Sequence, residues 1–224
     1  MKRDINSLIG YKIAATDGEL GEVTDFYFDD KAWTIRYLIV DTGKFLSERK
    51  VLISPQVVEK NFREPGKFKL NITVEQIQNS PNIDADLPVS RQQREVLHKH
   101  HAWENFWEAS FWGSGHADVE IAPEEVHPDE DFFAKYDIHL RSIEDVSGYG
   151  IHAADGEIGH VANFILDDET WQITQLVVDT RKWLSGHRVL VDVSHVLAVQ
   201  WRNYEVYVDM KIDEIDHSVE YAGA

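Results

Sequence analysis

The feature that most constrains this fold is an internal repeat. Residues 10–53 align without a gap with residues 148–191 at a constant shift of 138, and 23 of the 44 positions are identical. Identity at half of the positions over this length indicates duplication, so both copies are expected to fold alike. We therefore predict a first domain at 1–80, a connecting segment at 81–147 and a second domain at 148–224.

Each copy alternates turn residues with short apolar runs. Asp17-Gly18-Glu19 is a tight-turn signal, and it recurs as Asp155-Gly156-Glu157. In the first copy, strands are predicted at the following ranges: 23–28, 33–40, 51–53, 57–62 and 68–72. Thr73 followed by Gln76 forms a capping-box pattern that predicts a short helix. Several short strands with closely spaced turns are typical of a small β-barrel.

Three patterns shared by the copies carry a family resemblance. They are G-Y-x-I-x-A-x-D-G-E-x-G-x-V, the turn D-D-x-x-W, and the strand end V-D-T followed by K-x-L-S. With these motifs the chain resembles the PRC-barrel family, whose barrel occurs in the cytoplasmic part of the photosynthetic reaction-centre H subunit. The resemblance implies a mainly β fold with two small PRC-type β-barrels and short helices, joined by a partly helical linker. It also implies a binding or assembly role with no known catalytic residues, and we expect no cofactor.

The connecting segment has a helical pattern rich in aromatic residues. Ser90 and Gln93 form a capping-box pattern, and the apolar positions that follow recur at helical spacing as far as Phe111. This face has two interpretations: it packs against the barrels, or it is a surface for recognition or self-association, where Trp anchors are common. The candidate protein-interaction residues are Trp103, Phe106, Trp107, Phe111 and Trp112.

Two histidines of the same segment are candidate metal ligands. His98 and His101 are three residues apart, which on a helix lets both side chains approach one ion. The alternative is a pair of ordinary surface histidines, because no further ligand motif accompanies them.

Charge and composition exclude some classes of function. The net charge is −18, distributed as zero over residues 1–80, −10 over 81–147 and −8 over 148–224. So acidic a chain repels phosphate backbones, and we expect no nucleic-acid partner. No apolar run approaches the roughly 20 residues of a membrane helix, which predicts no membrane insertion. The chain has no cysteine, and together these features favour a cytoplasmic protein.

Paired carboxylates are the main candidates for chemistry. Asp29-Asp30 and Asp167-Asp168 could serve in acid–base work or cation binding, but acidic residues in a turn are more often structural. No phosphate-binding loop or nucleophile elbow accompanies them.

The sequence thus predicts a non-catalytic scaffolding protein that mediates protein–protein assembly. A homo-oligomer is expected, because small barrels are marginally stable alone. The alternatives are a metal- or small-molecule-binding protein using the His/Trp-rich centre, and an enzyme with a cleft between the barrels.

Overall fold

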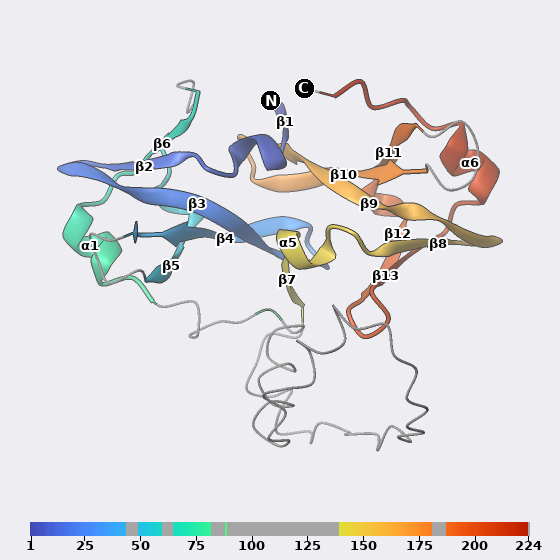
Figure 1. Ribbon diagram of the computed structural model, residues 1–224, viewed down its shortest axis with the longest axis horizontal. Coiled ribbons are helices and arrows are strands. Elements are labelled where there is room, and N and C mark those ends of the chain that lie inside the picture. The colour runs from blue at the N-terminus through green and yellow to red at the C-terminus, as the bar shows by residue number, and fades with distance from the viewer. Residues whose placement is uncertain (44–48, 60–64, 82–87, 89–138, 181–186, 224) are drawn as a thin grey trace, which may run out of the picture.

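The computed structural model describes residues 1–43, 49–59, 65–81, 88, 139–180 and 187–223. Within them the fold is mainly β, and two similar halves lie side by side (Figure 1). Both ends of the chain lie on the same side of the molecule (Figure 1).

The two halves contain corresponding elements in the same order, except that a 3₁₀ turn of the first half corresponds to an α-helix of the second, and the described part of the second half has one more strand. The elements of the first half are β1 (Lys2–Asp4), η1 (Asn6–Leu8), β2 (Lys12–Ala15), β3 (Gly18–Asp29), β4 (Thr34–Asp41), β5 (Lys50–Ile53), η3 (Pro55–Val57), β6 (Lys67–Lys69) and α1 (Val74–Gln78). The elements of the second half are β7 (Leu140–Ser142), α5 (Ile143–Val146), β8 (Gly150–Ala153), β9 (Gly156–Asp167), β10 (Gln172–Asp179), β11 (Arg188–Asp192), η5 (Val193–His195), β12 (Val196–Gln200), β13 (Glu205–Val208) and α6 (Ile212–Asp216).

Local sequence explains where several elements begin and bend. Thr73 accepts a hydrogen bond from the backbone N–H of Gln76, and the Gln76 side chain accepts one from the backbone N–H of Thr73, so the predicted capping box is confirmed. Val57, predicted to open a strand, instead ends the 3₁₀ turn η3, because Ser54 caps this turn and Pro55 occupies its first position.

A glycine bends the long hairpin strand in each half. Gly21 in β3 and Gly159 in β9 have φ angles of 66° and 58°. A Cβ atom on Gly21 would lie 2.0 Å from the carbonyl oxygen of Asp41, and one on Gly159 would lie 1.9 Å from that of Asp179. The two positions therefore require glycine for both conformation and space.

The strands of both halves form one continuous sheet. Its main path runs β12-β13-β8-β9-β10-β4-β3-β2-β6, so the halves join where β10 meets β4. At this point Gln172 pairs with Thr34. The backbone N–H of Ile35 donates to the carbonyl of Trp171 (2.8 Å), and that of Ile173 donates to the carbonyl of Trp33 (2.7 Å). These reciprocal hydrogen bonds relate the two halves by an approximate two-fold axis.

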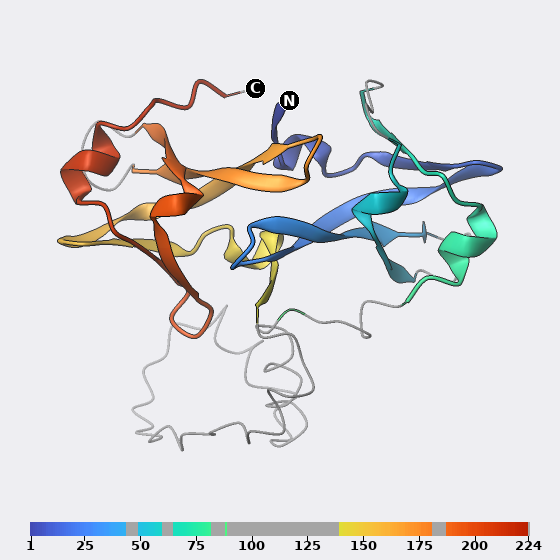
Figure 2. The ribbon, with the colours of Figure 1, turned by 180° about the vertical axis from the view of Figure 1, so that it is seen from behind.

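The first strand of each half pairs with the other half. Strand β1 is antiparallel to β9, with Lys2 opposite Asp167, and β7 is antiparallel to β3, with Leu140 opposite Asp29. Both pairings keep the shift of 138, so they are equivalent. The ribbon shows β1 beside the orange strands of the second half and β7 beside the blue strands of the first (Figures 1 and 2). The structural repeat therefore starts at residues 2 and 140, earlier than the alignment indicates.

One hydrophobic core extends through both halves. A single cluster of buried side chains includes residues of each repeat, from Ile5 and Leu8 to Ile215. Aromatic contacts cross the junction: the ring centroids of Phe28 and Phe164 are 5.7 Å apart, and those of Phe68 and Trp171 are 5.9 Å apart. The exchanged segments thus contribute to a shared interior.

The expectation of two separate barrels is corrected in this respect. The fold is mainly β, as predicted, but the strands lie in one open sheet. In the second half, the described residues show no ladder between β11 and β12 that would close a barrel. The halves share one sheet because β1, β7 and the β4–β10 contact form hydrogen bonds across the junction. The domain division at 80 and 148 stays a prediction. No helix in the described ranges is long and apolar enough to span a membrane.

Candidate functional site

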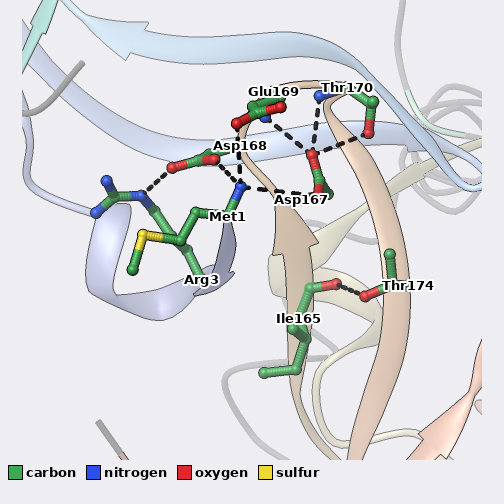
Figure 3. A network of polar contacts seen from close by, with 8 residues as sticks. All are labelled: Met1, Arg3, Ile165, Asp167, Asp168, Glu169, Thr170 and Thr174. Carbon is green, nitrogen blue, oxygen red and sulfur yellow. Dashed lines mark hydrogen bonds and ion pairs between the residues drawn. The ribbon is translucent and has the colours of Figure 1, made fainter. Parts of the chain in front are cut away.

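The Asp167–Trp171 turn, which follows β9, anchors the first residues of the chain. Oδ1 of Asp168 lies 2.5 Å from the Met1 ammonium, and its Oδ2 lies 2.6 Å from Nε of Arg3 (Figure 3). Burial alone would raise the pKa of Asp168, but the hydrogen bonds from Met1 and Arg3 outweigh it, and the pKa is lowered. Asp168 is therefore held as a carboxylate that joins β1 to the second half.

Its neighbour Asp167 shapes the turn itself. Oδ1 of Asp167 accepts hydrogen bonds from the backbone N–H groups of Glu169 (3.0 Å) and Thr170 (3.1 Å) (Figure 3). These two donors lower the pKa of Asp167. An Asp that caps its own turn in this way is a common turn device.

The equivalent turn in the first half holds β7. Oδ2 of Asp30 lies 2.6 Å from Nη2 of Arg141, and Oδ1 lies 2.9 Å from Nδ1 of His139. His139 thus takes the place that Met1 has in the other half, and Arg141 takes that of Arg3. Burial raises the pKa of Asp30, and Arg141 and His139 offset this only in part. Asp29 accepts from the N–H groups of Lys31 and Ala32, as Asp167 does in its turn.

A second pair of polar contacts also crosses the junction. Buried Asp25 accepts a hydrogen bond from Ser142 (2.6 Å) in the first half, whereas Asn163 donates to Asp4 in the second. Asp25 and Asn163 occupy equivalent positions, and so do Ser142 and Asp4. Both contacts are hydrogen bonds to a carboxylate, but the carboxylate belongs to the long strand in one contact and to the exchanged strand in the other.

A groove of about 910 Å³ opens where the halves meet. We call it the junction groove. It is lined by Thr34, Ile35, Arg36, Tyr37, Ser54, Pro55, Gln56, Val58, Glu59, Asp168, Glu169, Thr170 and Trp171. Its walls therefore come from β4 and η3 of the first half and from the Asp167–Trp171 turn of the second. Arg36, Gln56, Glu59 and Glu169 are exposed in it, beside the aromatic rings of Tyr37 and Trp171.

A smaller and more apolar groove adjoins it. This groove of about 460 Å³ is lined by Tyr37, Leu52, Ile53, Ser54, Val57, Ile72, Ser80 and Pro81. Tyr37 lines both grooves, and on this face it also packs against the buried side chains of Tyr27, Ile39 and Leu52. The outer face of the first half thus continues from the junction groove into an apolar surface.

Comparison with known families accounts for the first half. Residues 2–74 match the family model of the PRC-barrel domain. The first repeat is a PRC-barrel domain. No curated protein matches the chain. The match begins at β1 and ends at the start of α1, so the PRC-barrel domain includes the exchanged strand. The second half carries the same motifs through the internal repeat.

The residues predicted to recognise partners lie outside the described ranges. This applies to Trp103, Phe106, Trp107, Phe111 and Trp112, and equally to His98 and His101. Both assignments stay predictions. The carboxylate pairs, in contrast, are described. Asp29 and Asp167 cap their turns, and Asp30 and Asp168 bind arginine across the junction.

Sequence reasoning missed the residues that connect the PRC-barrel domain to the second half. Arg3 and Arg141 are related by the shift of 138, but they lie outside the aligned segments, which start at residues 10 and 148. Extending the alignment toward the N-terminus would have shown that this arginine is repeated in both copies, as the Asp-Asp turn is. The repeated arginine and the repeated turn would then have been candidates for an ion pair. The junction groove left no signal in the sequence, because its two walls come from different repeats.

Proposed function

We propose that this chain is a non-catalytic binding protein that mediates protein–protein assembly through the junction groove. The family match supports a binding role, since the PRC-barrel resemblance implies no catalytic residues. The observation that carries the proposal is the composition of the groove, which presents charged, amide and aromatic side chains from both halves.

The chemistry of the groove suits a polypeptide partner. Tyr37 and Trp171 offer aromatic surface, of the kind that anchors protein interfaces. Arg36, Gln56 and Glu169 provide donors and acceptors of both charge signs at the rim. The backbone hydrogen bonds to the carbonyls of Trp33 and Trp171 fix β4 relative to the Asp167–Trp171 turn, so two walls of the groove are already in place without a partner.

The contacts of the acidic turns favour binding over catalysis. A general acid or base needs a carboxyl group that can reach a substrate. Asp168 borders the groove, but both of its oxygens are occupied by Met1 and Arg3. Asp30 is nearly buried against Arg141 and His139. These carboxylates hold strands in place, which supports the proposal that the groove binds without reacting.

Site-specific photo-crosslinking in the full-length chain tests the proposal. A photoreactive amino acid is placed at Gln56 on one wall of the groove and, in a second variant, at Glu169 on the other. Both positions are exposed, so the substitutions should leave the fold intact. In cells that express the chain naturally, we expect the two variants to crosslink to the same protein, which mass spectrometry identifies.

A matched control uses Leu197, which is 69% exposed in the second half and is not among the groove residues. The same photoreactive group there should give no such product. Equal labelling from Leu197, or unrelated products from Gln56 and Glu169, would contradict binding in the groove.

The aromatic central segment remains part of the same proposal. A Trp103→Ala/Trp107→Ala double variant, carrying the photoreactive group at Gln56, asks whether that segment contributes to partner capture. Sedimentation of the unlabelled chain shows whether the captured partner is a second copy. One outcome is that the captured protein differs from this chain and that its capture is unchanged in the double variant. That result would assign recognition to the groove alone.

A further inference from the structure

Three strands of the second half place two carboxylates and an imidazole on one face of the sheet. His152 in β8 lies opposite Glu157 in β9 and opposite Tyr207 in β13. Glu205 is two residues before Tyr207 on β13, so its side chain points to the same face. The nitrogen of His152 and the carboxylate oxygens of Glu157 and Glu205 lie within 4.8 Å of one another.

Within the described part of the chain, this cluster has no cationic partner. Among the described residues, no Lys or Arg forms a salt bridge with Glu157 or Glu205, although two carboxylates so close together repel each other. Tyr207 donates a hydrogen bond to Glu205 (2.5 Å), which occupies one of the carboxylate oxygens. Nδ1 of His152 is buried and has no hydrogen-bond partner in the described part of the chain. A buried polar atom without a partner is rare in native proteins and needs an explanation.

The first half shows what the same position looks like when a cation is present. Glu19 is equivalent to Glu157, Lys67 to Glu205 and Ala14 to His152. There Nζ of Lys67 lies 2.5 Å from Oε1 of Glu19, so the protein supplies the positive charge itself. The second half replaces this lysine by a second glutamate and the alanine by a histidine. A built-in ion pair has thus become a set of three potential ligands.

We propose that His152, Glu157 and Glu205 bind a divalent transition-metal ion, for which Zn²⁺ is the probe. One imidazole and two carboxylates form an N/O donor set that suits Zn²⁺, with a further position left for water. Ligand atoms around tetrahedral Zn²⁺ are about 3.4 Å apart, given metal–ligand distances of about 2.1 Å. The three ligand atoms, now within 4.8 Å of one another, therefore need only small side-chain movements to coordinate the ion. Glu157 is exposed and has room for such a movement.

Binding there would connect β9, β8 and β13. These strands are neighbours toward one end of the sheet, where β13 is followed only by β12. An ion that binds the folded chain and not the unfolded one raises the unfolding temperature. This site is separate from the junction groove, and it goes beyond the assembly role proposed for that groove.

Calorimetric titration of the metal-free, full-length chain with Zn²⁺ tests the proposal, using Glu205→Lys as the paired variant. The variant recreates the Glu19–Lys67 pair in the second half, so it should fold normally. We expect it to bind one Zn²⁺ fewer per chain, or to bind at this site at least about tenfold more weakly, since even second-shell ligand changes cost this much. Other histidines contribute equally to both proteins and cancel in the comparison. Equal stoichiometry and affinity in the two proteins would overturn the proposal.

A transplanted site provides the converse test. Ala14→His, Lys67→Glu and Lys69→Tyr together rebuild the cluster in the first half, with Lys69 standing at the position of Tyr207. The triple variant should gain one Zn²⁺ per chain relative to wild type, with Lys67→Glu alone as its control. Circular dichroism shows that the variant is folded. A folded triple variant without the additional site would contradict the assignment of these side chains as the ligands.

Discussion

The two halves hold their exchanged strands with the same geometry but with different chemical groups. Arginine pairs with aspartate in both halves, as Arg3 with Asp168 and Arg141 with Asp30. Around this shared pair the groups differ. The Met1 ammonium on one side corresponds to the His139 imidazole on the other. Duplication thus kept the contact that joins the halves and varied its surroundings.

Away from the junction the halves differ more strongly. The Glu19–Lys67 ion pair of the first half corresponds to Glu157 and Glu205 in the second, a change from neutral to doubly negative. Glu19 and Glu157 are exposed and Lys67 and Glu205 are partly exposed, so water screens the change in charge. The comparison indicates that the junction determines the fold, whereas the outer strands were available for new binding properties.

Separating the halves should have the largest effect. A fragment of residues 1–81 keeps β1 and β3 but lacks their partners β9 and β7. Because both pairings are equivalent, β1 of one fragment can pair with β3 of another, with Arg3 next to Asp30. We expect the fragment to fold only as a dimer, which sedimentation equilibrium at several concentrations would detect.

An Arg3→Asp fragment is the control for that dimer. It places like charges at the junction, and it should dissociate and lose its β-sheet signal in circular dichroism. A fragment that is folded and monomeric at micromolar concentration would show that each half is independent, as the predicted division at residue 80 implies.

The glycines of the long strands should give the next largest effect. Gly159→Ala brings a Cβ atom to within 1.9 Å of the Asp179 carbonyl oxygen at a positive φ. We expect a loss of about 3 kcal/mol or more in the free energy of unfolding, measured by urea denaturation. Gly21→Ala should cost a similar amount, since the halves share this bulge.

Gly148→Ala separates backbone conformation from crowding. Its φ is 97°, but nothing lies within 4 Å of the added carbon, so a loss of about 1 kcal/mol is expected. Gly21→Ala could lower the free energy of unfolding as little as Gly148→Ala does, while Gly159→Ala lowers it strongly. That result would show that the first half relaxes around the added carbon and the second half does not, although their geometry is the same.

The sequence predicts the elements of each half well and their partners poorly. Turns at Asp17-Gly18 and Asp29-Asp30, and the capping box at Thr73, follow from local chemistry and are present. Strand exchange does not follow, because β1 would satisfy the same apolar pattern against either half. A period of two residues indicates which face is buried and leaves open which copy provides the partner.

The candidate sites differ in predictability for the same reason. The acidic turns were visible as pairs of neighbouring residues, but their arginine partners lie more than 100 residues away in the chain. The cluster of His152, Glu157 and Glu205 assembles from three strands and has no spacing motif. Comparing the two copies would have pointed to this cluster, because Lys67 and Glu205 occupy the same position of the repeat and have opposite charges.

The smallest expected effect concerns pH and distinguishes the two acidic turns. The folded-state pKa of Asp168 is lowered from its ordinary 3.8, so its stabilising contribution is present above that value and is lost as the pH falls through the folded pKa. That of Asp30 is raised from 3.8, so its contribution is present below 3.8 and declines as the pH rises through the folded pKa. Asp168→Asn should therefore lower the free energy of unfolding by about 1 kcal/mol at neutral pH, which is typical of a partly exposed ion pair, and by less in acid.

For Asp30→Asn, the loss in the free energy of unfolding relative to wild type should instead decrease as the pH rises. Urea denaturation of both variants and wild type between pH 3 and pH 7, a range of about four units spanning the carboxyl titration, gives the two slopes. Slopes of the same sign would mean that burial of Asp30 does not outweigh Arg141 and His139, and that the two junctions are electrostatically alike.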